Sequence, residues 1–74
     1  MFKIAALYKF FSINKPELLQ EEIRDHFKQL KIKGTILVGH EGINGTISGS
    51  GSSIDAAINF LKKINGCSEL DVKY

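Results

Sequence analysis

The chain has 74 residues, a formal net charge of +2, 43% hydrophobic residues and 24% charged residues. This length supports one domain with a single core, and the composition is that of an ordinary globular domain. No apolar run approaches the roughly 20 residues that span a membrane, which excludes a membrane-embedded class. The mild positive charge permits nucleic-acid binding without arguing for it, because a strong electrostatic footprint shows as clustered lysine and arginine.

Targeting and redox features point to the cytoplasm. The apolar opening at residues 1–11 lacks a small-residue cleavage site and leads directly into helix-start signals, so we interpret it as a strand and not as a signal peptide. The single cysteine, Cys67, has no partner for an internal disulfide. We therefore expect a cytoplasmic protein that makes no membrane contact.

The first part of the chain predicts a strand and then a helix. Residues 2–10 alternate as a strand, and the additional apolar residues Ala5 and Leu7 suit a central strand with partial cover on both faces. Asn14 and Glu17 form a capping-box pattern that starts the helix, and Pro16 fits its first turn. Two apolar sets define these elements: Phe2, Ile4, Ala6, Tyr8 and Phe10 on the strand, and Leu19, Ile23, Phe27 and Leu30 on the helix.

A hairpin is predicted in the middle of the chain. Residues 34–38 and 43–48 are rich in β-branched side chains and are separated only by the short break at residues 39–42. Gly42 can supply a positive φ near the turn, and Gly45 can allow close backbone approach within a strand.

The last part of the chain predicts a loop, a helix and an edge strand. Gly and Ser residues at 49–53 indicate a loop, from which Ser52 and Asp55 start the helix as a second capping box. Gly66 is placed to end that helix. The apolar positions are Ile54, Ile58, Leu61 and Ile64 on the helix, and Leu70, Val72 and Tyr74 on the strand.

In chain order the predicted elements follow βαββαβ, which is the ferredoxin-like arrangement. We expect residues 1–74 to form a single α+β domain with a four-stranded antiparallel sheet. Because each helix has one apolar stripe, both helices should cover the same face of the sheet. The other face is then open or covered by a partner.

Four short segments carry a resemblance to a known family. They are Ala6–Phe10, Lys33–Thr35, the hexapeptide Glu41–Thr46, and Ile54–Asp55 at the start of the second helix. With them the chain resembles, over essentially its whole length, the N-terminal domain of the rhodanese-domain tRNA uridine hydroxylases, a family of bacterial rhodanese-like proteins. The hexapeptide at its distance after Lys33–Thr35 is the specific part of this match.

The resemblance implies a two-part protein in which an acylphosphatase-like N-terminal domain precedes a rhodanese domain with the active-site cysteine. It implies that the full-length protein hydroxylates the wobble uridine of certain tRNAs to 5-hydroxyuridine, with molecular oxygen as co-substrate. On this basis the chain is the N-terminal fragment of a longer protein whose partners are tRNA and the downstream rhodanese domain. No cofactor is implied for this segment, and Cys67 does not match the family's catalytic cysteine.

We expect no catalytic residue and no metal site in this segment. Only acidic residues lie near Cys67 in the sequence, and they disfavour a reactive thiolate. The two histidines, His26 and His40, lack the spacing of metal ligands. An acylphosphatase needs an arginine in the loop at residues 11–15, but the only arginine is Arg24 within the predicted helix.

Five residues are candidates for contact with RNA or with another domain: Lys9, Lys33, His40, Glu41 and Asn44. Lys9 and Lys33 can contact phosphates. The polar side chains of Glu41 and Asn44 are not needed to form a hairpin, because many turn sequences would do so. Base stacking on the sheet is a weak interpretation, because the third predicted strand has no aromatic residue. We interpret the chain as a substrate-binding or scaffolding domain of a tRNA hydroxylase. The alternative is a free-standing ferredoxin-like module that binds a protein or a small ligand.

Overall fold

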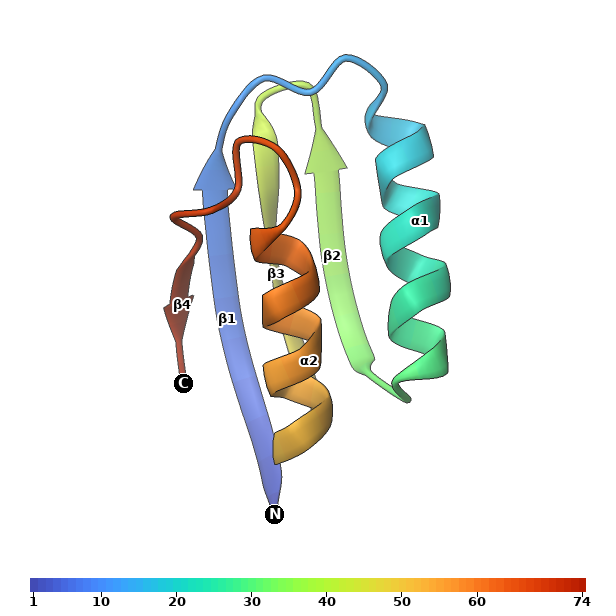
Figure 1. Ribbon diagram of the computed structural model, residues 1–74, viewed down its shortest axis with the longest axis vertical. Coiled ribbons are helices and arrows are strands. Elements are labelled where there is room, and N and C mark those ends of the chain that lie inside the picture. The colour runs from blue at the N-terminus through green and yellow to red at the C-terminus, as the bar shows by residue number, and fades with distance from the viewer.

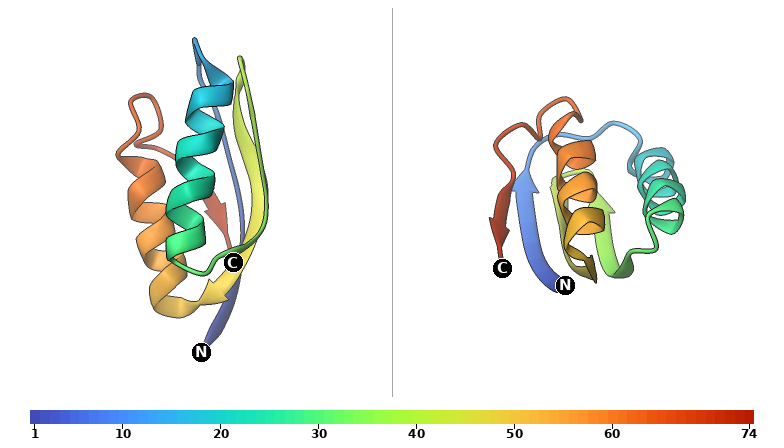
Figure 2. Two further views of the ribbon diagram at one scale, coloured as in Figure 1. Left: turned by 90° about the vertical axis from the view of Figure 1, so that its right-hand side faces the viewer. Right: turned by 60° about the horizontal axis from the view of Figure 1, so that its bottom comes forward.

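The computed structural model describes all residues, 1–74, as one sheet with two helices on the same face (Figures 1 and 2). The sheet has four antiparallel strands in the order β2-β3-β1-β4. This confirms the predicted ferredoxin-like α+β fold. The elements are β1 (Phe2–Phe10), α1 (Pro16–Gln29), β2 (Lys33–Gly39), β3 (Gly42–Ser50), α2 (Gly51–Lys62) and β4 (Asp71–Lys73).

The core lies between the helices and one face of the sheet. Ala5 and Leu7 of β1 point into it beside Ile43 and Ile47 of β3, and all four side chains are at most 2% exposed. The even-numbered side chains of β1 point to the opposite face, which nothing covers. The expected partial cover on both faces of this strand is therefore wrong. Neither helix has the length and apolar content needed to cross a membrane.

Close packing between strands depends on two glycines of the β2–β3 hairpin. His40 and Glu41 form the turn with negative φ, and Gly42 follows them with a φ of +143°. A Cβ atom at Gly45 would lie 2.1 Å from the carbonyl oxygen of Thr35 on β2. Both expectations for these glycines are confirmed. Only glycine adopts the positive φ of Gly42 without strain, and only a residue without a Cβ atom allows the close approach of backbone at Gly45.

The first helix begins differently from the sequence prediction. Its N-cap is Lys15, no side chain caps it, and Pro16 occupies its first turn as predicted. Asn14 is not the cap. The preceding loop is bonded to the hairpin, with the Ile13 N–H donating to the carbonyl of His40 at 3.0 Å. This tertiary anchor sets the direction in which the chain enters the helix, and the local capping pattern does not.

The second helix follows β3 without an intervening loop. Strand pairing between Phe2 and Ser50 keeps β3 extended to its last residue, so the expected loop at residues 49–53 is wrong. The Ser50 side chain is the N-cap and accepts a hydrogen bond from the Ser53 N–H at 3.2 Å. The Ser52–Asp55 capping box is therefore also wrong. Asp55 instead pairs with Lys3 across a 3.3 Å N···O distance.

Candidate interaction surfaces

The β2–β3 hairpin end brings together three of the predicted contact residues. His40, Glu41 and Asn44 all line one shallow hollow of about 430 Å³, together with Phe10 and neighbouring residues of β2. The predicted Lys33 lies at the opposite end of β2, about 20 Å away at the usual rise per strand residue. The five candidates therefore do not form a single site.

The hairpin tip is fastened to the loop that follows β1. The carbonyl of Glu41 accepts from the Phe11 N–H at 3.0 Å, and His40 Nδ1 lies 3.1 Å from the carbonyl oxygen of Ile13. His40 thus has a local structural role. The carboxylate of Glu41 is exposed and has no partner in the chain, so it is free to meet another molecule.

Asn44 lies on the uncovered face of the sheet, as its alternation with buried Ile43 predicts. Strand pairing places it between Leu37 of β2 and Tyr8 of β1. The rings of Tyr8 and Phe10 are 5.9 Å apart between centroids and inclined by 54°. An amide side chain thus stands within an apolar and aromatic surface.

This open face carries most of the exposed apolar side chains of the domain. Its members alternate along β1, with one more on β2, and each is between 45% and 77% exposed: Phe2, Ile4, Tyr8, Phe10 and Leu37. Exposed apolar surface of this extent on a small domain is typical of an interaction site. We call these five residues the open-face patch.

Lys9 does not belong to the open-face patch. It alternates with Tyr8 and Phe10, so it lies on the helix-covered side of β1, where it is partly buried near Cys67. Burial raises the pKa of the Cys67 thiol above its ordinary value, and the positive charge of Lys9 lowers it to a smaller extent. Cys67 has no exposed surface, so its surroundings favour the unreactive thiol.

The remaining titratable side chains do not gather into a reaction centre. No three His, Cys, Asp or Glu side chains are close enough together to hold a metal ion. His26 of α1 stacks on Phe60 of α2, with 3.9 Å between ring centroids and 9° between planes, which joins the two helices. Arg24, the only arginine, lies on α1 and not in the loop where an acylphosphatase needs one.

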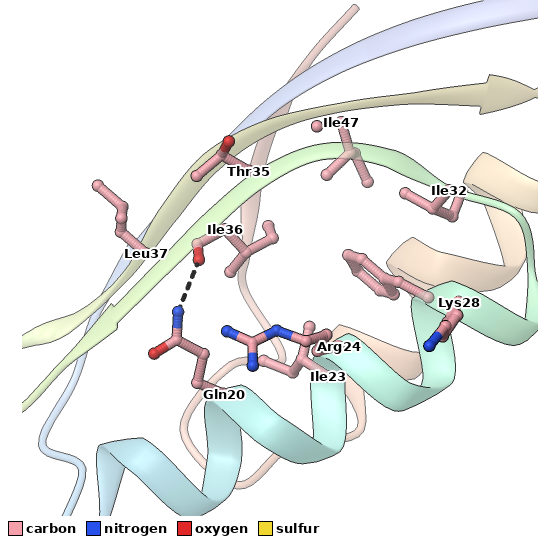
Figure 3. A pocket seen from close by; sticks show the side chains of 11 residues that line it. Gln20, Ile23, Arg24, Lys28, Ile32, Thr35, Ile36, Leu37 and Ile47 are labelled. Carbon is pink, nitrogen blue, oxygen red and sulfur yellow. Dashed lines mark hydrogen bonds between the residues drawn. The ribbon is translucent and has the colours of Figure 1, made fainter.

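A groove between α1 and β2 was not predicted from the sequence. It has a volume of about 410 Å³, and Gln20, Arg24 and Lys28 of α1 stand along it opposite the strand (Figure 3). The spacing of four residues that aligns these three side chains is visible in the sequence. Their position over a sheet edge depends on the strand order, which the sequence pattern does not give.

Residues 2–74 match the UPF0176 acylphosphatase like domain. The chain belongs to this family. A "tRNA uridine(34) hydroxylase" of Roseobacter denitrificans is 42% identical over 73 residues, which are 99% of this chain and 25% of that protein. A protein of the same name from Prochlorococcus marinus (strain NATL2A) is 44% identical over 75 residues, covering 99% of this chain and 24% of that protein.

These family members are much longer than the chain, which spans about a quarter of the curated relatives it matches. A solved structure, the de novo designed protein Ferredog-Diesel, is similar in fold with a TM-score of 0.62 and 15% sequence identity. That match covers all of this chain and 85% of the designed one. At so low an identity it supports the fold alone.

Proposed function

We propose that this chain is the N-terminal domain of a tRNA uridine(34) hydroxylase. The observation that carries this proposal is the similarity to proteins of that name along 99% of the chain. In this proposal the full-length protein converts the wobble uridine of tRNA to 5-hydroxyuridine with molecular oxygen. The reacting cysteine belongs to a downstream rhodanese domain, and the 74-residue segment takes no part in the chemistry.

The role proposed for the domain is scaffolding. The open-face patch is apolar, and the only cations on that face are Lys33 and Lys73, accompanied by Asp71. Such a surface suits burial against protein better than contact with phosphates, because apolar surface gains roughly 25 cal/mol for each Å² removed from water. About three quarters of the length of the Roseobacter relative lies outside the matched region, and a polypeptide of that size can cover the open-face patch. We propose that this patch packs against the rhodanese part and fixes it relative to bound tRNA.

A direct contact with tRNA is the second candidate. Tyr8 and Phe10 present exposed rings side by side, and such rings stack unpaired bases in other proteins of this fold. Against it, β3 contributes no aromatic side chain to the same face. A tRNA contact made instead through lysines weakens with added salt, whereas apolar packing within the protein does not.

A matched pair of leucines tests the scaffold proposal. Leu37 in the open-face patch is 57% exposed and Leu18 on α1 is 58% exposed, so Leu37→Lys and Leu18→Lys remove equal apolar surface at two places. Each variant is introduced into the full-length hydroxylase, and wobble 5-hydroxyuridine is measured by mass spectrometry of tRNA digests. The assay uses cells that lack other hydroxylases, with thermal melts of each purified protein as a folding check.

We expect Leu37→Lys to reduce modification severalfold and Leu18→Lys to leave it unchanged. Equal modification by both variants refutes docking through the patch. A wild-type full-length protein that leaves uridine unmodified refutes the hydroxylase proposal itself. In the same assay, Glu41→Ala and Asn44→Ala should fold normally but reduce modification, because their side chains have no partner within the domain. Normal modification by both would restrict the hairpin to a structural role.

A further inference from the structure

The groove between α1 and β2 lies beside a free strand edge. β2 is the terminal strand of the sheet, so its outer side pairs with no other strand. The Gln20 amide on α1 donates to the outward carbonyl of Ile36 at 3.3 Å (Figure 3). In an antiparallel strand the N–H and C=O of one residue point the same way and alternate along the chain. The outward groups of β2 therefore belong to Gly34, Ile36 and Val38, and Gln20 occupies only one of them.

This edge lacks most of the devices that block strand addition, and although α1 lies beside it (Figure 1), only the Gln20 side chain is hydrogen-bonded to it. Natural edge strands are shortened, bulged, or carry proline or inward charges. β2 has seven residues without proline, and its only charged residue, Lys33, lies at one end. Beside the edge, the groove floor is apolar and includes Ile23, Phe27 and Ile47. An extended peptide can thus form backbone hydrogen bonds with β2 and bury apolar side chains in the groove at the same time.

Charge selects the kind of peptide. Arg24 and Lys28 line the groove, and no acidic residue does. The one ion pair in the chain joins Lys3 and Asp55, so both groove cations lack a carboxylate partner. They lie four residues apart, which is about 6 Å along a helix. Alternate side chains of an added strand are about 6.7 Å apart, so two acidic residues at positions i and i+2 match this spacing.

We propose that this groove binds an extended acidic segment of another polypeptide as a fifth strand along β2. The segment pairs its backbone with Gly34, Ile36 and Val38, displaces the Gln20 amide, and directs two carboxylates at Arg24 and Lys28. A second copy of β2 fits poorly, since it carries a cation and no carboxylate. RNA fits less well, because Arg24 and Lys28 can meet phosphates but the apolar groove floor and the outward backbone groups of β2 match an extended peptide.

The test titrates the ¹⁵N-labelled chain with a blocked seven-residue peptide that has glutamate at positions 3 and 5 and threonine or valine elsewhere. We expect amide shifts and slowed hydrogen exchange at Gly34, Ile36 and Val38, with no change at the β4 edge residue Val72. A peptide with lysine in place of both glutamates should bind at least tenfold more weakly. A peptide N-methylated at alternate residues should lose binding, because it cannot complete the strand ladder.

Charge-reversal variants supply the matched control. The Arg24→Glu, Lys28→Glu pair should weaken binding of the glutamate peptide at least tenfold, whereas a Lys62→Glu, Lys63→Glu pair at the C-terminal end of α2 should not. Equal binding of the glutamate and lysine peptides, or shifts confined to other surfaces, overturns the proposal. So does concentration-dependent protection of the β2 amides without peptide, which identifies a second copy as the occupant. A single-stranded RNA oligonucleotide that shifts these amides more strongly than the peptide also overturns it.

Discussion

A methyl group added at Gly45 tests how closely β2 and β3 approach one another. The Cβ atom of Gly45→Ala would lie 2.1 Å from the Thr35 carbonyl oxygen and 2.9 Å from the Ile36 Cα atom. Both contacts are to backbone, so no side-chain rotation relieves them. The strands must separate by roughly 1 Å or more, in the middle of a continuous pairing register, before the contact becomes tolerable.

The cost of this separation follows from overpacking. Inserting a methyl group into a packed region that cannot yield costs about 1–3 kcal/mol of the free energy of unfolding. Alanine also lowers the conformational entropy of the unfolded chain, which raises the free energy of unfolding by about 0.4–1 kcal/mol. A net loss of about 1–2 kcal/mol lowers the melting temperature of a domain of this size by about 4–16 °C.

Gly39→Ala is the matched control. It lies in the same hairpin, its Cβ would meet nothing within 4 Å, and its φ lies outside the positive range. Only the unfolded-chain term then remains, so Gly39→Ala should raise the free energy of unfolding by about 0.4–1 kcal/mol. Urea and thermal unfolding of both variants, followed by circular dichroism, measure the difference. Equal stability of the two variants would refute the reasoning, because the change in unfolded-chain entropy is common to both.

Three further predictions concern the helix cap, the thiol and the hairpin anchor. Ser50→Ala should destabilise the domain by about 0.5–2 kcal/mol in urea unfolding and Asn14→Ala should not, since only the former removes a cap. A larger loss of stability for Asn14→Ala than for Ser50→Ala would show that Asn14 caps α1 as the sequence predicted. Because the folded pKa of Cys67 is raised, its contribution to stability is complete below the ordinary thiol pKa and is lost as pH rises through the folded value. The native thiol should therefore react with a disulfide reagent at pH 8 at least tenfold more slowly than in denaturant, and equal rates would contradict its burial. His40→Ala should cost about 1 kcal/mol in thermal unfolding through loss of its contact with the Ile13 carbonyl, and an unchanged melting temperature would show that this contact contributes nothing.

The sequence by itself determined the order and type of the elements. Apolar residues at helical spacing predicted both helices, and Ile23, Phe27, Ile54 and Leu61 are buried as those stripes require. Residues 34–38 and 43–48 predicted a hairpin that the structure extends by one or two residues at each end. These features are predictable because backbone geometry fixes periods of 3.6 and two residues within each element.

The candidate site was predictable only in part. Alternation with buried Ile43 placed Asn44 correctly on the open face, and the same period puts Lys9 on the covered side, away from the patch. The specific segment at residues 41–46 correctly indicated the family. Which of its side chains meet a partner depends on the shape of the partner's surface, which is a property of the complex and not of the local residue pattern.

Only the tertiary structure decided the helix starts, the strand order and the groove. Ser50 caps α2 because pairing with Phe2 holds the strand extended up to that residue, and a local capping pattern carries no information on pairing with a residue so distant in the sequence. Arg24 and Lys28 face a free edge because β2 is outermost in the sheet. Helix propensities and caps act over a few residues, so the sequence pattern specifies each helix and strand. Strand order is non-local, because it depends on how the apolar faces of distant elements pack together.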